Sequence, residues 1–538
     1  MNSTVWHIRI FLLAVILLLV CPACYAQEDA RLTQFVQLNS IFSFGDNAPF
    51  WLTANKQGIS SLNSNNGYVR YGIAFDSPIG KTGQWRYRIA GELLAGYNRR
   101  SPLFVQELYA EFSWRWMNIT IGSKERDAEM RGCNATVSAA SGEVLNHLYG
   151  RYLGELGTGG LLYSGNSAPI PQVRFEVPEY VNIGGVNSWV KMRGHFAYGM
   201  FLDADFQEDF TASNRTARYA KNVLYCSRAF FMKVGKIEKF PLELELGLEM
   251  YSQFGGDFYT HSKGKYLSMP RKAVDYFKAF IPLSGDESTP FPEQSNISGN
   301  QIGNWHLALT HKNRYFDVRV YGEHLFEDFS QLFFFEYQSN RNGKRRITFY
   351  PWRDVQLGIS VTNKTGYLKF ISSLQYEYTS MYDQSGACYN DPGPVYSEQM
   401  DGLDNYYNHS IYPGWHYYGM GIGNPLAISP LYNGNGSLVF GGNRFKAHNV
   451  GVNGVFASRD SFRYRLMYTY SENWGTYINP FDKKKYTTSL LADILYVTKN
   501  KKWMFALSLA YDKSNYIGDN WGAMLSMANV GLFSGKRR

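Results

Sequence analysis

Apolar and polar residues alternate along many short stretches of the chain. In PLELELGLEM (241–250), leucines and a methionine occupy every second position, and glutamates and a glycine fill the positions between them. Side chains along a β-strand point to opposite faces in turn, so this segment predicts a strand with one apolar and one acidic face. On a helix the same apolar residues would be spread around the axis, which disfavours a helix here.

The same pattern recurs in QWRYRIAGEL (84–93), RYFDVRVYGE (314–323) and SFRYRLMYTYS (461–471). In each segment one face is apolar and rich in aromatic side chains and the other is charged, and together the charged faces carry both signs. Strands of about ten residues with two such faces are typical of transmembrane β-barrels. We therefore predict an all-β fold, a transmembrane antiparallel up-and-down β-barrel with about eighteen strands and long extracellular loops.

The lengths of the connections support a barrel. Short connections alternate with long ones at 45–66, 123–158, 201–221, 253–303, 326–353, 380–442 and 472–485, provided that 159–177 counts as one interrupted strand. Outer-membrane barrels have short periplasmic turns and long outer loops, so this alternation places both termini in the periplasm. Within 123–158, SGEVLNHLYGRYLG (141–154) has helical spacing and could fold into the barrel mouth as a plug. The predicted strands are 35–44, 67–76, 84–96, 104–114, 116–122, 159–177, 188–200, 222–235, 242–252, 304–312, 315–325, 354–363, 367–379, 443–457, 461–471, 486–498, 502–511 and 521–533.

Composition narrows the class of membrane protein. Aromatic residues make up 17% of the chain, which suits interfacial belts. Mean hydropathy is negative at -0.32, which argues against a bundle of transmembrane helices. The one long apolar run, 10–20, follows His7 and Arg9 and precedes small residues, so it predicts a secretory signal peptide over 1–26, cut before Gln27. The barrel domain then spans 27–538, and its export implies the outer membrane of a Gram-negative cell.

The longest outer loop holds the candidate binding residues. Its core, NYYNHSIYPGWHYYGMGIGNPL (405–426), crowds tyrosines and a tryptophan with asparagine and histidine side chains. Aromatic faces stack on the CH faces of sugars, and amide and imidazole groups hydrogen-bond their hydroxyls. The alternative is that these aromatic side chains only pack the loop or belong to the outer aromatic girdle. The predicted polysaccharide-binding residues are Tyr406, Tyr407, Asn408, His409, Trp415, His416 and Tyr417.

Charge indicates the type of partner. The chain carries a formal net charge of +9, with basic clusters at 341–346 and 483–485. This charge suits an acidic polysaccharide or the phosphates of lipopolysaccharide, although a solvated surface without a partner would show it too. Nucleic acid is not expected outside the cell. Charges on the polar strand faces, among them Glu243, Glu245, Arg463 and Arg465, are expected to pair across the interior, with ion selection in a pore as the alternative.

Common catalytic and metal-binding motifs are absent from the sequence. We find no GxSxG elbow, HExxH pair, P-loop or Rossmann glycine pattern, and no CxxC pair. We therefore expect no enzyme activity, no cofactor and no metal site. A barrel hydrolase that assembles its catalytic residues from neighbouring strands stays formally open, because histidines are available at 147, 195, 311, 324 and 448.

Four segments resemble a known family. GDNAPFWLTANKQG (45–58), GGLLYSGNSAPIPQV (159–173), YGEHLFEDFS (321–330) and YYNHSIYPGWHYYGMGIGNPL (406–426) resemble the Bacteroidetes branch of the capsule-assembly Wzi family. The resemblance implies an outer-membrane barrel that acts as a surface lectin and holds exported capsular polysaccharide on the cell, without catalysis. We therefore expect a protein that binds capsular or other surface polysaccharide and anchors or assembles it. The alternative is an outer-membrane pore or transporter for solutes or glycans.

Overall fold

The alternating segments form strands that close into a barrel. The computed structural model describes residues 30–80, 84–127, 156–185, 188–281, 299–327, 336–339, 345–348, 353–364, 367–368, 370–386, 402–456 and 461–531. They form an 18-stranded antiparallel sheet in which the first strand, β1 (Arg31–Phe44), pairs with both β2 (Asn66–Ile79) and the last strand, β27 (Asn520–Val530). This pairing closes the ring and leaves the sheet no free edge. The predicted fold class is confirmed.

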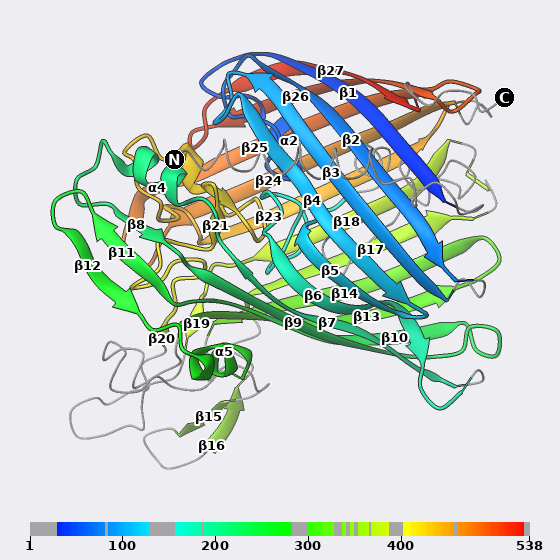
Figure 1. Cartoon of the computed structure of the whole chain (residues 1–538), viewed down its shortest axis with the longest axis horizontal. Coiled ribbons are helices and arrows are strands. Elements are labelled where there is room, and N and C mark those ends of the chain that lie inside the picture. Colours follow the sequence, from blue (N-terminus) through cyan, green and yellow to red (C-terminus); the bar gives the residue numbers. More distant parts are fainter. Residues whose placement is uncertain are drawn as a thin grey trace.

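The barrel strands follow one another around the ring in chain order (Figure 1). Each predicted strand except 159–177 overlaps one of them over most of its length. Between β2 and β27 they are β3 (Trp85–Tyr97), β4 (Leu103–Trp114), β5 (Met117–Ser123), β6 (Gln172–Asn182), β7 (Val190–Met200), β9 (Leu224–Val234), β10 (Leu242–Phe254), β13 (Asn300–Lys312), β14 (Phe316–Glu327), β17 (Val355–Asn363), β18 (Ile371–Ser380), β23 (Phe445–Val455), β24 (Phe462–Gly475), β25 (Pro480–Val497) and β26 (Trp503–Ser514).

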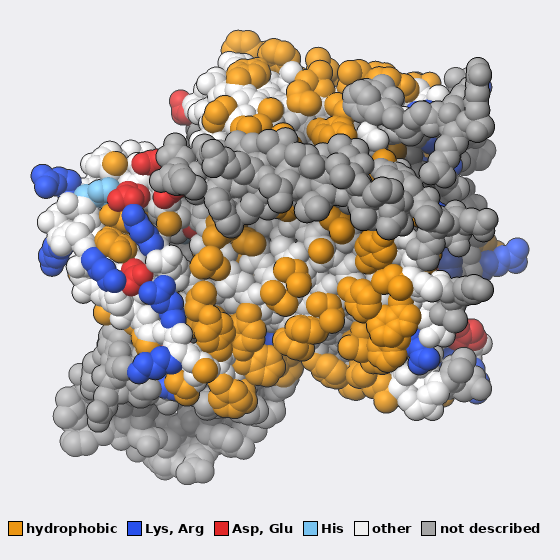
Figure 2. Space-filling view, viewed as in Figure 1, with side chains coloured by type: hydrophobic (Ala, Val, Ile, Leu, Met, Phe, Trp, Pro, Cys, Tyr) orange, Lys and Arg blue, Asp and Glu red, His pale blue; other side chains and the backbone are white. Residues whose placement is uncertain are grey.

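The apolar faces of the strands form the outer wall. In β10, Leu244 and Leu246 are exposed, whereas Glu243, Glu245 and Glu249 are buried on the inner face. Figure 2 shows hydrophobic side chains over the middle of the barrel and charged side chains gathered toward its two ends. An apolar outer band with polar ends is the arrangement that a lipid bilayer requires.

Inner charges pair with charges of nearby strands, both adjacent strands and strands one position further around the ring. Glu245 lies 3.1 Å from Arg319, and Glu243 lies 3.5 Å from a lysine of β7. Arg465 lies 2.5 Å from Asp493. Because a buried charge is costly without a partner, these pairs allow charged residues to line the inner wall.

The long connections all lie at one end of the barrel, the long-loop end, and every connection at the other end is short. Three short connections, 98–102, 476–479 and 515–519, also lie at the long-loop end; the second replaces the predicted long connection 472–485, because β24 and β25 extend into it. The first barrel strand begins and the last one ends at the end with the short turns, where Arg31 pairs with Asp76 and Val530 pairs with Phe35. In Figure 1 the C-terminus marks this end. The predicted placement of this end in the periplasm stays a prediction.

Residues 159–171 do not form a strand, so the prediction for 159–177 is wrong over this part. β6 begins only at Gln172. The preceding segment is rich in glycine, and its Pro169 and Pro171 have no backbone N–H to donate to a ladder. It folds into the barrel instead, where the Leu161 N–H donates to the inward carboxylate of Glu323 at 2.8 Å.

The long connections contain further elements. A short helix, α2 (Phe50–Thr53), lies in the first of them, and a small sheet lies in two others, with strands β8 (Arg218–Lys221), β11 (Gly256–Thr260) and β12 (Gly264–Met269). Among the described residues, no helix is both long enough and apolar enough to cross a lipid bilayer. The predicted signal peptide and the predicted helix at 141–154 lie outside the described residues. The remaining elements are α4 (Ala204–Thr211), α5 (Ala273–Phe280), β15 (Glu336–Ser339), β16 (Arg345–Thr348), β19 (Ser385–Gly386), β20 (Gly402–Leu403), β21 (His416–Tyr417), β22 (Met420–Gly421) and the 3-10 helix η4 (Pro430–Tyr432).

Candidate functional site

The aromatic loop 405–428 folds into the barrel instead of projecting from it. Trp415, Tyr406, Tyr407 and Tyr412 are the bulkiest of the fully buried side chains among the described residues. They share one hydrophobic cluster with side chains of the infolded segment 156–171 and with inward-facing residues of the wall, such as Tyr225. The loop therefore closes the lumen from the long-loop end.

Trp415 links the loop to both of its neighbours. Its indole Nε1 donates to the Leu162 carbonyl at 2.9 Å, which joins the loop to the infolded segment. Its ring stacks on Tyr225 at a centroid distance of 6.4 Å and meets Tyr251 edge-on at 6.2 Å, which joins the loop to β9 and β10. A buried indole needs a hydrogen-bond acceptor, and the carbonyl supplies it.

Tyr407 makes a second connection of the same kind. Its hydroxyl donates to the Leu161 carbonyl, and its backbone N–H donates to the Glu327 carboxylate at 2.7 Å. Burial holds the pKa of the Tyr407 hydroxyl far above its usual range, so the group stays a donor. The hydroxyl of Tyr406 also donates inward, to the Leu325 carbonyl of β14 at 3.5 Å.

The polar residues of the loop bond to backbone groups of the same long connection. The Asn408 amide donates to the Phe440 carbonyl at 3.0 Å and accepts the Phe440 N–H at 2.8 Å. His409 Nδ1 accepts the N–H of Ile411 at 3.1 Å. Burial lowers the pKa of His416 to about 3, and burial with the nearby Arg218 charge lowers the pKa of His409 to about 4. Both rings are therefore neutral at physiological pH.

The structure thus brings all seven predicted binding residues together, but with their surfaces covered. Six are buried, and the seventh, His409, is half-buried. Tyr417 packs against Phe201 with ring centroids 5.6 Å apart, and is itself among the buried side chains. Direct contact between these residues and a polysaccharide stays a prediction, and their position gives them a structural role in the plug.

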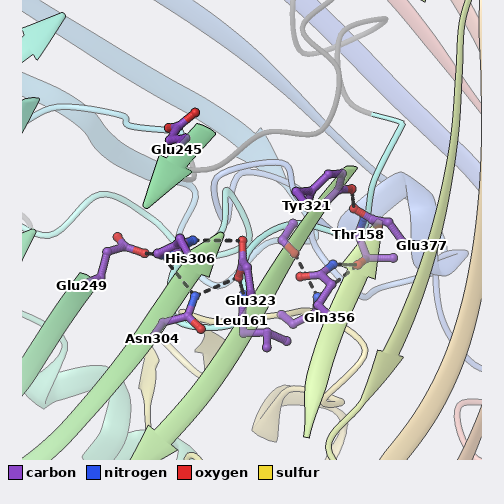
Figure 3. A network of polar contacts seen from close by, with 12 residues as sticks. Thr158, Leu161, Glu245, Glu249, Asn304, His306, Tyr321, Glu323, Gln356 and Glu377 are labelled. Atoms are coloured by element: carbon purple, nitrogen blue, oxygen red, sulfur yellow. Dashed lines mark hydrogen bonds and ion pairs between the residues drawn. The ribbon is translucent and has the colours of Figure 1, made fainter. Parts of the chain in front are cut away.

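The infolded segment 156–171 is held by inward side chains of several strands (Figure 3). The Thr158 N–H donates to Glu377 of β18 at 2.6 Å, and its hydroxyl accepts from the Gln356 amide of β17 at 2.9 Å. Glu323 of β14, which accepts the Leu161 N–H, also accepts from the Asn304 amide at 2.9 Å. The inner wall here supplies acceptors for a backbone that has no strand partners.

A histidine extends this network to β10. His306 of β13 lies 2.6 Å from Glu249 through Nε2 and 3.6 Å from Glu323 through Nδ1 (Figure 3). On the other side of the segment, the Tyr321 hydroxyl donates to Glu377. Inward polar side chains of β10, β13, β14, β17 and β18 thus form two groups that the infolded segment joins, one at Leu161 and one at Thr158.

The segment around α2 fills the opposite side of the lumen. The Phe50 N–H donates to Asp512 of β26 at 2.8 Å, and the Trp51 indole donates to the Thr469 hydroxyl of β24 at 3.1 Å. The Asn55 amide donates to the Thr158 carbonyl at 2.9 Å, so this segment also contacts the infolded segment 156–171. We call the three inward segments, 47–60, 156–171 and 405–428, the plug.

A cavity lies on the inner side of β1 to β4. Its volume is about 360 Å³, and its wall includes Arg88, Glu92, Glu107 and Lys124. Carboxylate oxygens of Glu92, Glu107 and Glu125 lie within 4.8 Å of one another. The guanidinium of Arg70 lies 2.5 Å from Glu92 and 3.6 Å from Glu125 and so offsets part of this charge.

The basic clusters predicted from the sequence have different outcomes. On β25, Lys483 and Lys484 are exposed and Lys485 is half-buried, and the Lys484 ammonium lies 3.1 Å from Glu472. In the second cluster, residues 341–344 lie outside the described part of the chain. Their contact with an acidic partner stays a prediction.

The sequence did not predict the residues that hold the plug. Glu323, Gln356 and Glu377 lie at polar positions of alternating strands, where the pattern indicates only an inward direction. One feature of the sequence could have indicated them, namely the glycines and prolines at 157–171. A backbone rich in these residues does not form a regular strand, so its polar groups need side-chain partners when it is buried.

Comparison with known proteins supports the fold. No known protein family and no curated protein matches the sequence. Among solved structures, the chain is similar to Wzi of Escherichia coli, an outer-membrane protein involved in group 1 capsule assembly and a carbohydrate-binding β-barrel. The TM-score is 0.52 at 12% identity, over 92% of this chain and 83% of Wzi. At this identity the similarity is one of fold, and the predicted membership of the Wzi family stays a prediction.

Other outer-membrane barrels also match over most of their length. OccK5 (OpdH) of Pseudomonas aeruginosa gives a TM-score of 0.45 at 7% identity, over 94% of this chain and 98% of that one. OccAB4 of Acinetobacter baumannii gives a TM-score of 0.44 at 7% identity, again over 94% and 98%. These scores add nothing on function. The chain is thus a barrel of the outer-membrane type.

Proposed function

We propose that this protein lies in the outer membrane, binds capsular or other surface polysaccharide at its long-loop end, and holds the polymer at the cell surface without catalysis. The observation that carries this proposal is the plug. Hydrogen bonds from its three segments reach the inner faces of β10, β14, β17, β18, β24 and β26, among others. A lumen filled in this way suits a surface binder better than a diffusion pore.

The exposed surface above the plug suits a polysaccharide. Loop residues Ser213, Arg215 and Thr216 are exposed there, as are Ser410 and Asn435. The two outer loops are tied together, since the Asn214 amide donates to the Asn435 carbonyl at 3.1 Å. Hydroxyl, amide and guanidinium groups on a fixed surface can bond sugar hydroxyls and carboxylates. In this proposal the seven predicted aromatic and polar residues support the binding surface from within.

Binding to purified polymer tests the proposal. The full chain, reconstituted in lipid nanodiscs, is exposed to surface polysaccharide purified from its own cells, and the binding is measured by biolayer interferometry. Two side-chain bonds are lost in Arg215→Ala with Asn435→Ala, so we expect roughly tenfold weaker binding. The matched control, Lys501→Ala with Lys502→Ala, changes exposed residues at the short-turn end and should bind normally. Absence of binding by the unaltered protein would contradict the proposal.

A pore is the second candidate, and the cavity beside β1 to β4 is the observation that favours it. Its charged wall, with Arg88 and Lys124 facing Glu92 and Glu107, could pass a small ionic solute if the plug left a path. Conductance in planar lipid bilayers separates the two functions. We expect no steady open channel from the unaltered protein, and a stable ohmic conductance would favour the pore.

A further inference from the structure

Helix α5 lies on the outside of the barrel, near the long-loop end (Figure 1). It covers outward-facing positions of three neighbouring strands, namely Tyr198 of β7, Cys226 of β9 and Phe254 of β10. Cys226 is fully buried there although it faces away from the lumen. The helix is therefore an addition to the wall that lipid would otherwise contact.

Helix α5 turns apolar side chains outward and its acidic side chain inward, the opposite of what is expected for a helix in water. Its acidic residue, Asp275, is buried, whereas Phe277 is 55% exposed, Val274 49% and Ile281, just after the helix, 42%. Tyr276 and Phe280 are exposed as well. A helix on a protein surface in water turns its apolar side inward. An apolar outer face is the arrangement of a helix that lies at a membrane surface.

Specific bonds fix this orientation. Arg228, on the outer face of β9, donates to the Ala279 carbonyl at 3.0 Å, and Ser252 of β10 donates to the same carbonyl at 3.3 Å. The Tyr198 hydroxyl donates to the Tyr276 carbonyl at 2.8 Å. These bonds satisfy carbonyls at the end of the helix and polar groups on the outer wall, which could not face lipid unpaired.

The apolar face of α5 continues the apolar wall of the barrel. Phe280 meets Phe196 of β7 at a centroid distance of 6.3 Å, and Phe196 itself is exposed on the outer wall. The residues of β10 beneath the helix, Met250 to Phe254, lie about 20 to 33 Å along the strand from Leu244, at a rise of about 3.3 Å per residue. Because the strands are tilted by about 40°, this is about 15 to 25 Å along the barrel axis. An apolar band is about 25 Å tall, so α5 lies near its upper border.

Basic residues adjoin the apolar face. Arg271 and Lys272 are exposed directly before the helix, and Lys278 lies within it. Between 256 and 281 there are five basic residues against two acidic ones, Asp257 and the buried Asp275. Figure 2 shows basic side chains gathered at this end of the molecule, next to the hydrophobic wall. The apolar side chains suit contact with the acyl chains of an anionic lipid, and the adjoining cations suit contact with its phosphates.

We propose that α5 is an interfacial helix whose apolar face lies among the acyl chains of the outer leaflet, while Arg271 and Lys272 bind the phosphates of its glycolipid. This site would fix the height and rotation of the barrel in the membrane. It is independent of the proposed binding of polysaccharide, because it lies on the outer wall and not on the loops above the plug.

A fluorescent probe tests the contact with lipid. Phe277→Cys, in a chain whose native cysteines are alanine, is labelled with nitrobenzoxadiazole and reconstituted in vesicles of phosphatidylcholine and lipid A at about four to one. We expect a blue-shifted emission that spin-labelled acyl chains quench. The control is Ile478→Cys, which is 74% exposed at the tip of the β24–β25 connection and should stay in water. Electrophoretic heat-modifiability checks that both variants form the barrel.

Two results of this experiment would overturn the proposal. Emission from position 277 like that of position 478 would place the helix in water. A blue shift without quenching by lipid would place it against protein, such as a second copy of this chain.

Charge reversal tests the contact with phosphate. Arg271→Glu with Lys272→Glu should lower the lipid A retained per barrel, measured by native mass spectrometry after detergent exchange, by roughly tenfold or more. Lys501→Glu with Lys502→Glu makes the same change of charge at the short-turn end and should retain lipid A normally. Equal retention in the two variants would overturn the assignment of Arg271 and Lys272 to phosphate binding.

Discussion

Replacement of Trp415 by alanine should open the plug while leaving the barrel intact. The side chain is fully buried, and its contacts are to the infolded segment 156–171 and to the aromatic rings of Tyr225 and Tyr251. Trp415 is not part of the barrel sheet, so the pairing of the strands does not depend on it. The substitution therefore separates the stability of the plug from that of the barrel.

The expected cost follows from what the side chain does. A buried tryptophan replaced by alanine destabilises its surroundings by about 3–5 kcal/mol, because apolar contacts are lost and a cavity remains. The Leu162 carbonyl also loses its donor at 2.9 Å. A loss of this size raises the population of opened plug by roughly 100-fold or more.

Hydrogen exchange measures this population directly. Backbone amides of 405–428 should exchange roughly 100-fold faster in Trp415→Ala, whereas amides in the middle of β24 to β26 should keep their protection. The matched control is Trp521→Ala on the outer wall, where Trp521 is 57% exposed and stacks on Phe44 at 4.5 Å. It removes the same type of residue without touching the plug. Unchanged exchange of 405–428 in Trp415→Ala would refute the view that this residue holds the plug.

Three further predictions concern buried polar groups, two in the plug and one in the barrel wall. Glu323→Leu removes the acceptor of the Leu161 N–H. The loss of this bond should cost about 1–3 kcal/mol, so the amide of Leu161 should exchange roughly tenfold faster. Equal exchange rates would show that this bond does not hold the segment. The pKa of His409 is lowered to about 4 and that of His416 to about 3, from an ordinary value of 6.5, because both are buried. As the pH falls, these histidines therefore take up protons in the opened loop before they do so in the closed plug. The full stability of the plug is present above pH 6.5 and decreases as the pH falls from there toward 4. The decrease is up to about 1.4 kcal/mol per pH unit for each histidine. Exchange of 405–428 should be faster at pH 5 than at pH 7, a difference that His409→Gln with His416→Gln should reduce; equal protection at both pH values in the unaltered protein would count against it. Arg465→Met leaves Asp493 buried without its guanidinium and should cost the barrel roughly 3–5 kcal/mol in guanidinium-induced unfolding, whereas adding Asp493→Leu should recover most of the loss; a single variant as stable as the unaltered protein would refute this pairing.

The barrel could be predicted because each strand is determined by the pattern of its own residues, and the same pattern recurs along the chain. A side-chain period of two, as in the segment 241–250, determines both the strand and which face meets lipid. The alternation of short and long connections, although it is incomplete, then indicates which ends of the strands carry the long loops. The prediction failed at 159–171, because the expected alternation of short and long connections required this segment to be part of one interrupted strand. In the folded chain, Leu161 and Leu162 belong to a hydrophobic core that lies inside the lumen.

The candidate site was harder to predict because it is built by contacts between distant segments. The sequence indicated that Trp415 and Tyr407 belong to one aromatic cluster, and the structure brings them together. It could not indicate that their partners are the carbonyls of Leu162 and Leu161, some 250 residues earlier. Whether an aromatic cluster faces solvent or a plug depends on such contacts, which no local pattern encodes.

The most direct test of the proposed function is the distribution of surface polysaccharide in a strain that lacks this gene, compared with the same strain carrying the gene again. Cell-bound polymer, released polymer and their total are quantified together. We predict that polymer moves from the cells to the medium at constant total, and that the restored gene returns it to the cells. Unchanged retention at unchanged total would contradict the account.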